Sequence, residues 1–494
     1  MGLPRPINTA SLTPPMPYPD FQAFLAHLEA KGQLKRVRAE VDPKLEITEI
    51  ADRLVRTGGP AVLFEKVKGS EIPVAINTYG SLKRMAWALG VEDVEEVAQQ
   101  IQALLQLKPP SGMLEKLKML PTLLDMGSWA PKTVSSGICQ EVTVDPPSFG
   151  KLPILQCWPK DAGRFITLPL VISRDPVTGN RNVGMYRIQV VDDRTALMHW
   201  QLHKDGARHA ADAKARGKKV EVAVCLGGDP CLPYCATAPL PPQVDELLFA
   251  GFLRKKPVEL VKARTVDLEV PADCEIVLEG TVDPAETRLE GPFGDHNGYY
   301  STPAPYPVFH LTGMTHRRKP VYPTIVVGIP PKEDDYLGKA TERIFLPLVR
   351  QVLPEIVDMN LPFEGIFHNL AIVSIRKRYP GHARKVMSAV WGLGQLMFTK
   401  VVVVVDHDVD VHDLKQVAWK VGCSIDPRRD LMFADGPLDA LDHASPMSNW
   451  GSKVVIDATR KGPDEGHTRE WPSEIAMDDA VRRRVTDRWP ELGL

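Results

Sequence analysis

The chain lacks a long hydrophobic run, an excess of one charge and a large set of cysteines. None of its 494 residues lie in a stretch near the roughly 18 uninterrupted apolar residues of a membrane span, and no basic region followed by an apolar core begins the chain. We therefore expect a cytoplasmic protein without a secretory signal. The 60 basic and 62 acidic side chains give a net charge of −2, which argues against nucleic acid as a partner.

The seven cysteines are too scattered for a disulfide framework, and their odd number fits reduced thiols. Cys231 and Cys235 are the one close pair. A zinc site would need a second pair of ligands at similar spacing, and none follows. We therefore do not expect a metal-thiolate site.

The length and the apolar patterns predict an α+β protein of several domains. Residues 1–19 hold six prolines and few apolar anchors, which is typical of a flexible arm. Residues 20–125 are predicted to form a small α/β unit. It starts with a helix whose apolar residues fall at i, i+3, i+4 and i+7 after the N-cap Asp20, namely Phe21, Phe24, Leu25 and Leu28. The pattern then predicts a strand over 34–41, a helix over 45–54, a strand over 72–76 and a linker at 108–112.

Residues 126–330 change to short β-rich runs without alternating helices, which is typical of an antiparallel barrel or sandwich. One short helical pattern covers 245–253. The predicted strands are 141–144, 183–191, 220–226, 276–278, 308–311 and 321–327.

Residues 331–494 return to an α/β pattern and are predicted to form a separate domain. The predicted elements are helices over 335–352 and 381–398 and strands over 370–375 and 401–405. The last of these is a run of five valines, as expected for a parallel strand that is buried on both faces. Three aspartates follow it, Asp406, Asp408 and Asp410, and we favour a polar strand end over a metal site there.

The most informative stretch is rich in glycine and reads Glu290-Gly-Pro-Phe-Gly-Asp295-His-Asn-Gly-Tyr-Tyr300. It places two carboxylates five residues apart on a backbone bent by glycine and proline. Paired acids in different environments are what acid/base chemistry requires. A hairpin loop with solvated acids is the alternative that this stretch alone leaves open.

Three further segments accompany this motif in order: Asn182-Val-Gly-Met-Tyr-Arg187, Met198-His-Trp-Gln-Leu-His203-Lys-Asp, and the glutamate at 246. Together the four motifs resemble the UbiD family of decarboxylases, and the likeness runs from about residue 20 to the C-terminus. It is closest to the branch that acts on 4-hydroxy-3-polyprenylbenzoate in ubiquinone biosynthesis. The resemblance implies a split β-barrel over 126–330 that holds prenylated FMN, and a C-terminal domain over 331–494 through which dimers assemble to hexamers.

The resemblance also implies the ligands of the cofactor. A divalent ion, usually manganese, with potassium as a further candidate, is expected on Asn182, His203 and Glu246, where it bridges to the flavin phosphate; such mixed donors suit a hard cation. His199 and His203 have the i, i+4 spacing of zinc ligands, but Trp200 stands where the glutamate of that motif belongs. The residues expected to contact the flavin and its phosphate are Met185, Tyr186, Arg187, His199, Trp200, Gln201, Lys204 and Asp205.

In the chemistry that the resemblance implies, an aromatic acid forms a covalent adduct with prenylated FMN, loses CO2 and is protonated on the ring. Asp295 matches the proton donor, and Glu290 matches its partner through Arg187, which lies between the two acids and the substrate carboxylate. A structural salt bridge is the alternative role for Arg187. Two acids and an arginine in contact are expected to titrate as a coupled set.

Several alternatives remain at the level of function. Other members of the family act on phenolic, heteroaromatic or acrylic acids. An ordinary FMN oxidoreductase is a second interpretation, although the chain has no fingerprint for a nicotinamide. A flavin-binding scaffold is a third. The expected partners are the substrate acid, the flavin prenyltransferase that supplies the cofactor, further copies of the chain, and the membrane surface by peripheral contact, because a polyprenyl tail is insoluble.

Overall fold

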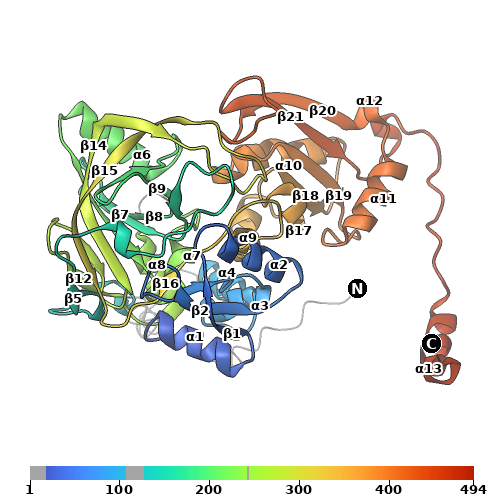
Figure 1. The fold of residues 1–494 in the computed structure, drawn as a ribbon. Helices are drawn as coiled ribbons and strands as arrows, with labels where there is room; N and C mark the ends of the chain where they lie inside the picture. Colours follow the sequence, from blue (N-terminus) through green and yellow to red (C-terminus); the bar gives the residue numbers. More distant parts are fainter. Residues whose placement is uncertain (1–17, 107–126, 242–243, 494) are drawn as a thin grey trace, which may run out of the picture.

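The computed structural model describes residues 18–106, 127–241 and 244–493. These residues form three mixed units, which confirms the predicted α+β multidomain class (Figure 1). Most of the predicted arm over 1–19 and the whole linker at 108–112 lie outside the described residues. The limits of the three predicted domains stay predictions.

The N-terminal unit is built on a small sheet with the strand order β1-β2-β3-β16. Its helix α1 begins as predicted, because the Asp20 carboxylate accepts a hydrogen bond from the N–H of Ala23 at 2.8 Å. The predicted apolar stripe of α1 is buried. The elements are α1 (Phe21–Ala30), β1 (Leu34–Val41), α2 (Glu46–Arg56), β2 (Ala61–Val67), β3 (Val74–Ile76), α3 (Leu82–Ala88) and α4 (Val94–Leu105).

The central unit is dominated by a curled nine-stranded sheet, as predicted for a split barrel (Figure 1). Its order is β6-β9-β10-β15-β14-β11-β7-β8, with β5 paired to β15, and β13, β12 and β4 form a separate small sheet. The strands are β4 (Lys132–Thr133), β5 (Val142–Thr143), β6 (Arg164–Ile166), β7 (Leu170–Arg174), β8 (Arg181–Gly184), β9 (Ile188–Val190), β10 (Thr195–Met198), β11 (Val220–Leu226), β12 (Glu259–Lys262), β13 (Glu269–Pro271), β14 (Ile276–Glu290), β15 (Ala304–His316) and β16 (Tyr322–Pro323). The helices are α6 (Asp205–Ala215), α7 (Leu232–Cys235) and α8 (Glu246–Arg254), with short 3-10 turns at Ile138–Gln140 and Phe149–Lys151.

The longest strands, β14 and β15, form an antiparallel hairpin in which Glu290 stands opposite Ala304. The glycine-rich motif is therefore the turn of this hairpin. Many of the hairpin's apolar side chains, such as Val277, Leu278 and Val308, are fully buried in the sheet. A turn at the end of such a hairpin is held in place by the sheet itself.

The limits of four strand predictions in this unit need correction. The predicted strand over 183–191 is two strands, because β8 pairs with β7 while β9 pairs with β6 and β10. The strands predicted over 276–278 and 308–311 are present but longer, because β14 continues to Glu290 and β15 covers Ala304–His316. The strand predicted over 321–327 contains only β16, which pairs in parallel with β3 of the N-terminal sheet. Local apolar patterns gave no sign of these breaks and partners, because pairing is decided by distant segments.

The C-terminal unit is a five-stranded sheet with the order β17-β18-β19-β21-β20, in which β18, β19 and β21 are parallel. The valine run forms β19 as predicted, with Val402, Val404 and Val405 fully buried. The strands are β17 (Ile356–Asn360), β18 (Leu370–Ile375), β19 (Val401–Asp406), β20 (Leu431–Pro437) and β21 (Trp450–Asp457). The helices are α9 (Glu333–Val352), α10 (His382–Trp391), α11 (Leu414–Ser424), α12 (Pro427–Asp430) and α13 (Asp479–Leu492), with 3-10 turns η4 (Phe363–Gly365), η5 (Gly394–Phe398) and η6 (Pro463–Glu465).

One helix prediction needs correction, and one helix beside the site was not predicted. The helix predicted over 381–398 is broken into α10 and η5, because Gly394, the first residue of η5, takes φ of 48°, which an α-helix does not allow. Helix α6 was not predicted. Its buried face consists of glycine, histidine and alanines at Gly206, His209, Ala210 and Ala213, which give too weak an apolar stripe to recognise.

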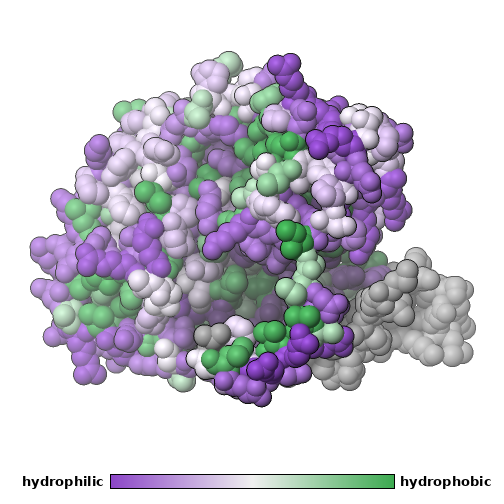
Figure 2. All heavy atoms as spheres, turned by 90° about the vertical axis from the view of Figure 1, so that its right-hand side faces the viewer, coloured by the Kyte–Doolittle hydropathy of each residue, from purple (hydrophilic) through white to green (hydrophobic). Residues whose placement is uncertain are grey.

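The C-terminal unit contacts the N-terminal unit through its first helix, α9. Helix α9 packs against α3 and α4, and its Glu333 carboxylate accepts hydrogen bonds from the N–H groups of Asn77 and Tyr79 at 2.9 and 3.0 Å. In contrast, α13 buries none of its residues and stands away from the rest of the protein (Figure 1). On this side the surface has a hollow that contains apolar residues (Figure 2). Among the helices of the described part of the chain, none is long and apolar enough to cross a membrane.

Candidate active site

The turn between β14 and β15 is held by hydrogen bonds from its own backbone. The N–H of Gly291 donates to Oε1 of Gln189 at 2.8 Å, and the N–H of Gly294 donates to Oδ1 of Asp161 at 2.8 Å. A Cβ atom at Gly294 would collide with the indole of Trp158, so only glycine fits there. The turn therefore has one path, which fixes where its two acids point.

Glu290 and Asp295 meet the guanidinium of Arg187, which lies in the gap between β8 and β9. Nε and Nη2 of Arg187 donate to the two oxygens of Glu290 at 2.8 and 2.9 Å, and Nη1 contacts Oδ2 of Asp295. The side chains of Arg187, Glu290 and Asp295 are 8%, 0% and 10% exposed. The motif is thus a hairpin loop, but its acids are buried, and the alternative of solvated acids is wrong.

Charge in this network outweighs burial. Burial raises the pKa of Glu290. Hydrogen bonds from His199 and Arg187 lower it by more than burial raises it, so that the pKa is about 2. Burial acts in the same way on Asp295, and the charge of Arg187 and the hydrogen bond from His296 hold the pKa of that carboxyl well below its usual range. Both acids are therefore ionised at neutral pH while the network is intact.

His199 belongs to this network and not to a helical metal site. It follows the end of β10, where Nδ1 is 3.3 Å from Oε2 of Glu290 and the ring lies 4.3 Å from that of Tyr306. Burial, followed by the charge of Arg187, lowers the pKa of His199. His203 lies before α6, so the two histidines do not share a helix.

Asn182 and Glu246 approach each other on a second side of the site. Glu246 opens α8, and its Oε2 accepts the N–H of Val183 at 3.0 Å, next to Asn182 on β8. Burial, together with the nearby acids Asp245 and Asp205, raises the pKa of Glu246 to about 7, against hydrogen bonds from the backbone N–H groups of Glu246 and Val183 that lower it. No lysine, arginine or histidine of the described residues forms an ion pair with Glu246. A half-buried acid without a cation partner fits a metal ligand.

His203 does not join this pair. It is exposed, and its ring lies 5.2 Å from that of Phe398 in η5 of the C-terminal domain. Across the described ranges, no three His, Cys, Asp or Glu side chains gather in a group that could hold a metal. Glu246 therefore lies beside the strand that carries Asn182, whereas His203 lies at the contact with another domain.

The residues predicted to hold the flavin surround the start of α6. Tyr186 Oη accepts the N–H of Gly206 at 3.2 Å, and a Cβ at Gly206 would lie 2.6 Å from Nε1 of Trp200. That indole nitrogen is buried and has no hydrogen-bond partner in the described part of the chain. The ammonium of Lys204, at the N-cap of α6, is half-buried and makes no hydrogen bond or ion pair with the described residues, and burial lowers its pKa.

These features fit a phosphate. The first N–H groups of a helix and an unpaired lysine attract an anion. Of the other predicted contacts, Asp205 is paired with Arg208 at 2.9 Å, Met185 packs against the main core, and Gln201 is half-buried. The surroundings of Lys204 and Trp200 therefore support flavin binding. Those of Met185, Gln201 and Asp205 give little further support.

The C-terminal domain lies against the hairpin turn. Nε2 of His296 is 2.9 Å from Nε2 of His368, and Nδ2 of Asn297 donates to the carbonyl of Leu441 at 2.6 Å. In the sequence, His296 stands out only as the neighbour of Asp295, and nothing there points to His368. The partner lies 72 residues further along the chain in another domain, where no spacing connects the two.

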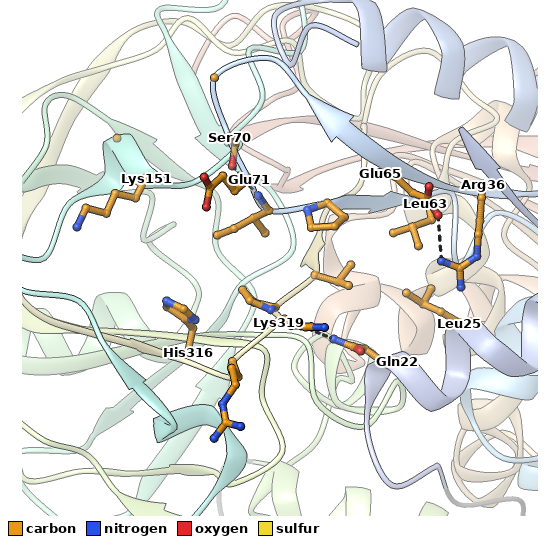
Figure 3. Close-up of a pocket in the computed structure, with 17 residues that line it drawn as sticks. Gln22, Leu25, Arg36, Leu63, Glu65, Ser70, Glu71, Lys151, His316 and Lys319 are labelled. Atoms are coloured by element: carbon orange, nitrogen blue, oxygen red, sulfur yellow. Dashed lines mark hydrogen bonds and ion pairs between the residues drawn. The ribbon is translucent and has the colours of Figure 1, made fainter. Parts of the chain in front are cut away.

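A separate cavity of about 900 Å³ lies between α1, β2 and the residues around His316 (Figure 3). Its rim carries basic side chains, including Lys151 and Lys319, and the acids Glu65 and Glu71. None of the predicted site residues line it. This cavity is therefore separate from the acid network, and the candidate active site is assigned from the chemistry of its residues.

Three family models match the chain. They describe the N-terminal, Rift-related and C-terminal domains of 3-octaprenyl-4-hydroxybenzoate carboxy-lyase, over residues 25–104, 132–330 and 335–458. The chain belongs to the UbiD family. The UbiD enzymes are decarboxylases, so the protein is a carboxy-lyase, and the resemblance seen in the sequence is confirmed.

Two uncharacterised proteins are similar to this UbiD chain over nearly its whole length. One from Archaeoglobus fulgidus is 53% identical over 97% of this chain and 99% of its own, and one from Aquifex aeolicus is 50% identical over the same shares. Among solved structures, the UbiD-class enzyme HmfF from Pelotomaculum thermopropionicum, in complex with FMN, is 32% identical with a TM-score of 0.78 over 95% of this chain and 99% of its own.

The vanillic acid decarboxylase of Sedimentibacter hydroxybenzoicus is informative because it has been solved in two forms. It is 29% identical to this chain, and 96% of this chain and 99% of that chain align. The TM-score is 0.83 with its closed form and 0.77 with its open form. This UbiD protein is therefore more similar to the closed form than to the open form.

Proposed function

We propose that this UbiD protein removes CO2 from an aromatic carboxylic acid with the help of prenylated FMN, and that Arg187, Glu290 and Asp295 are the residues at the reacting centre. The single observation that carries the proposal is the buried arginine that bridges the two acids of the hairpin turn. HmfF, a similar structure, is described in complexes with FMN and with prenylated FMN.

The three residues divide the work between binding and proton transfer. Arg187 holds a positive charge at the position where a substrate carboxylate can bind, and Glu290 fixes its orientation through two hydrogen bonds. Asp295 lies on the other side of the guanidinium, where it can deliver a proton to the carbon that loses CO2. Phe293 stacks 4.9 Å from the guanidinium and excludes water from it.

The prenylated flavin, when bound, supplies the electron sink that no side chain can provide for an aryl carbanion. We propose that its phosphate binds at the N-terminus of α6, near Lys204, and that Trp200 Nε1 donates to a polar atom of the cofactor. Asn182 and Glu246 are proposed to hold a divalent ion, manganese first, beside that phosphate, with His203 as a third ligand. The uncompensated Glu246 carboxyl and the orphaned indole nitrogen support this arrangement.

For the substrate, we propose 4-hydroxybenzoates, with 4-hydroxy-3-polyprenylbenzoate of ubiquinone biosynthesis as the first candidate. The family models are named for the octaprenyl acid, whereas the similar solved enzyme acts on vanillic acid. Both acids carry a hydroxyl opposite the carboxyl group, which donates electrons to the ring. A polyprenyl acid would have to be collected by peripheral contact with a membrane or from a partner.

The test is a panel of acids offered to protein purified from cells that also express the flavin prenyltransferase. The chromophore is identified by its spectrum and mass, and product formation is followed by chromatography. Turnover of 4-hydroxybenzoates, with dependence on the prenyltransferase, is the expected result. Plain FMN that turns over no acid, or hydride exchange with a nicotinamide, would contradict the proposal.

Oligomer formation through the C-terminal domain is also proposed, since one similar structure is described as an evolved dimeric form of HmfF. Light scattering on the purified protein measures the mass directly.

A further inference from the structure

The imidazole of His296 lies between two groups that come from different domains. Its Nδ1 is 2.9 Å from Oδ1 of Asp295, and its Nε2 is 2.9 Å from Nε2 of His368. Asp295 belongs to the hairpin turn, whereas His368 precedes β18 in the C-terminal domain. A ring that is hydrogen-bonded at both nitrogens has one orientation. His296 is therefore fixed by the two domains together.

The segment that presents His368 has an unusual backbone. Ile366 and Phe367 both have φ of 48°, a conformation that is costly for any residue except glycine and most costly for a β-branched one. The ring of Phe367 lies 5.4 Å from the ring of His296. On its other side Phe367 packs against Gly338 of α9, where a Cβ would lie 2.6 Å from the phenyl side chain. Strain is thus stored where Phe367 and His368 meet His296.

The charges around the pair give the two histidines different protonation states. His296 faces four acids: Asp295 on its own loop, Asp334 and Asp335 of α9, and Asp439 between β20 and β21. Burial lowers the pKa of His296, but the hydrogen bond and the charge of Asp295 raise it to about 9.

His368 faces the cations His296 and Lys204 as well as Asp439. Burial, and then the charge of His296, lower the pKa of His368 to about 4. At neutral pH His296 is therefore an imidazolium that donates from both nitrogens, and neutral His368 accepts at Nε2.

We propose that His296 holds the proton that Asp295 delivers, and that His368 is a positioning residue which keeps His296 aimed at Asp295 only while the C-terminal domain contacts the hairpin turn. The inference rests on the proposed decarboxylation. It also explains how Asp295, ionised in the intact network, can act as a proton donor. The greater similarity to the closed form of the vanillic acid decarboxylase fits a contact that is made when the domains close.

The proton balance is simple. Nδ1 of His296 gives its proton to Oδ1 of Asp295, and the Asp295 carboxyl gives a proton to the carbon that has lost CO2, where a C–H bond forms. His296 is left neutral. It regains one proton from solvent water when the domains separate, which equals the one proton that each decarboxylation of a carboxylate consumes.

The first experiment is an NMR titration of the cofactor-free protein labelled at histidine, with His296→Gln to assign the signal. His296 is expected to titrate near 9 in the wild type. His368→Leu removes the acceptor and is expected to lower that midpoint by about one to two pH units. His368→Gln offers an amide oxygen to the same N–H and is expected to restore most of the shift.

Asn297→Ala is the matched control, because it removes another hydrogen bond between the same two domains and leaves both histidines in place. Its midpoint is expected to stay within about 0.3 pH units of the wild type. A wild-type midpoint near the ordinary 6.5, an unchanged midpoint in His368→Leu, or an equal shift in Asn297→Ala would each overturn the proposal.

The second experiment measures the pH profile of kcat with any acid that the wild type turns over. His368→Leu is expected to lower kcat about tenfold or more at neutral pH and to move the alkaline fall of kcat to lower pH, with KM little changed. An alkaline limb that is the same in His368→Leu and the wild type contradicts the role of His368. If the wild type turns over no acid, the proposed function fails, whereas the titration still decides the contact between His296 and His368.

Discussion

The two sides of the active site differ in how many of their charged groups have a partner within the chain. On the acid side, Arg187 is paired with Glu290 and Asp295, and every partner is buried. On the side of α6 and α8, neither Glu246 nor Lys204 forms an ion pair with the described residues, although Asp439 and Asp205 lie near enough to Lys204 to act on its pKa. The comparison teaches that the protein alone assembles its acid/base group, whereas the other side is built for groups that must be bound.

The largest expected effect comes from breaking the acid side. Arg187→Leu leaves two buried carboxylates without their cation, so we expect the free energy of unfolding to fall by about 3–5 kcal/mol and turnover to fall by about 10³-fold or more. Thermal unfolding and steady-state kinetics measure both effects. Arg53→Leu, which breaks a pair that is more than half exposed on both sides, serves as the control and should cost less than about 1 kcal/mol. Equal effects of the two substitutions would mean that the buried network contributes no more to stability than an exposed ion pair does.

Asp295→Asn separates proton transfer from structure on the same side. The amide keeps the size of the side chain and removes the transferable proton, so turnover should fall by about 10²–10⁴ with fold and flavin content retained. Content of flavin is read from the spectrum, and turnover from product formation. Activity within about threefold of the wild type would make Asp295 a structural loop acid and pass the donor role to Glu290.

Glu246→Gln tests the unsatisfied side, and we expect opposite effects with and without ligands. Because the pKa of Glu246 is raised to about 7, the unfolded chain releases this proton at lower pH than the folded chain. Its ionisation therefore destabilises the folded cofactor-free protein increasingly from about pH 4.5 to 7. The variant should melt higher than the wild type at pH 8 and equally at pH 4, as scanning calorimetry can show.

With manganese and flavin added, the same variant should retain less of both, because a lost ligand releases the ion and the phosphate that it bridges. Elemental analysis and the flavin spectrum measure this retention. A variant that keeps stoichiometric manganese and flavin would show that Glu246 is not a ligand.

The smallest effect is expected from Lys204→Gln. Loss of one point charge at the phosphate should weaken FMN binding about tenfold, and more at low than at high ionic strength. Fluorescence titration of the cofactor-free protein with FMN at two salt concentrations gives both numbers. An affinity that does not depend on Lys204 at either salt concentration would place the phosphate elsewhere.

The sequence by itself determined the family and the fold class, and it predicted the candidate reacting residues. Four short motifs sufficed for this, because the glycines of the turn and the acids beside them are local features whose spacing is written in the chain. The valine run of β19 and the start of α1 at Asp20 were equally readable. Each depends on neighbours within a few residues.

The tertiary structure decided what depends on distant partners. It broke the predicted strand over 183–191 and so placed Arg187 in a gap that faces the hairpin turn. It also moved His203 to the contact with the C-terminal domain and brought His368 to His296. Whether an acid is buried or solvated, and which histidine holds a proton, follows from packing between segments far apart in the chain, which local patterns do not record.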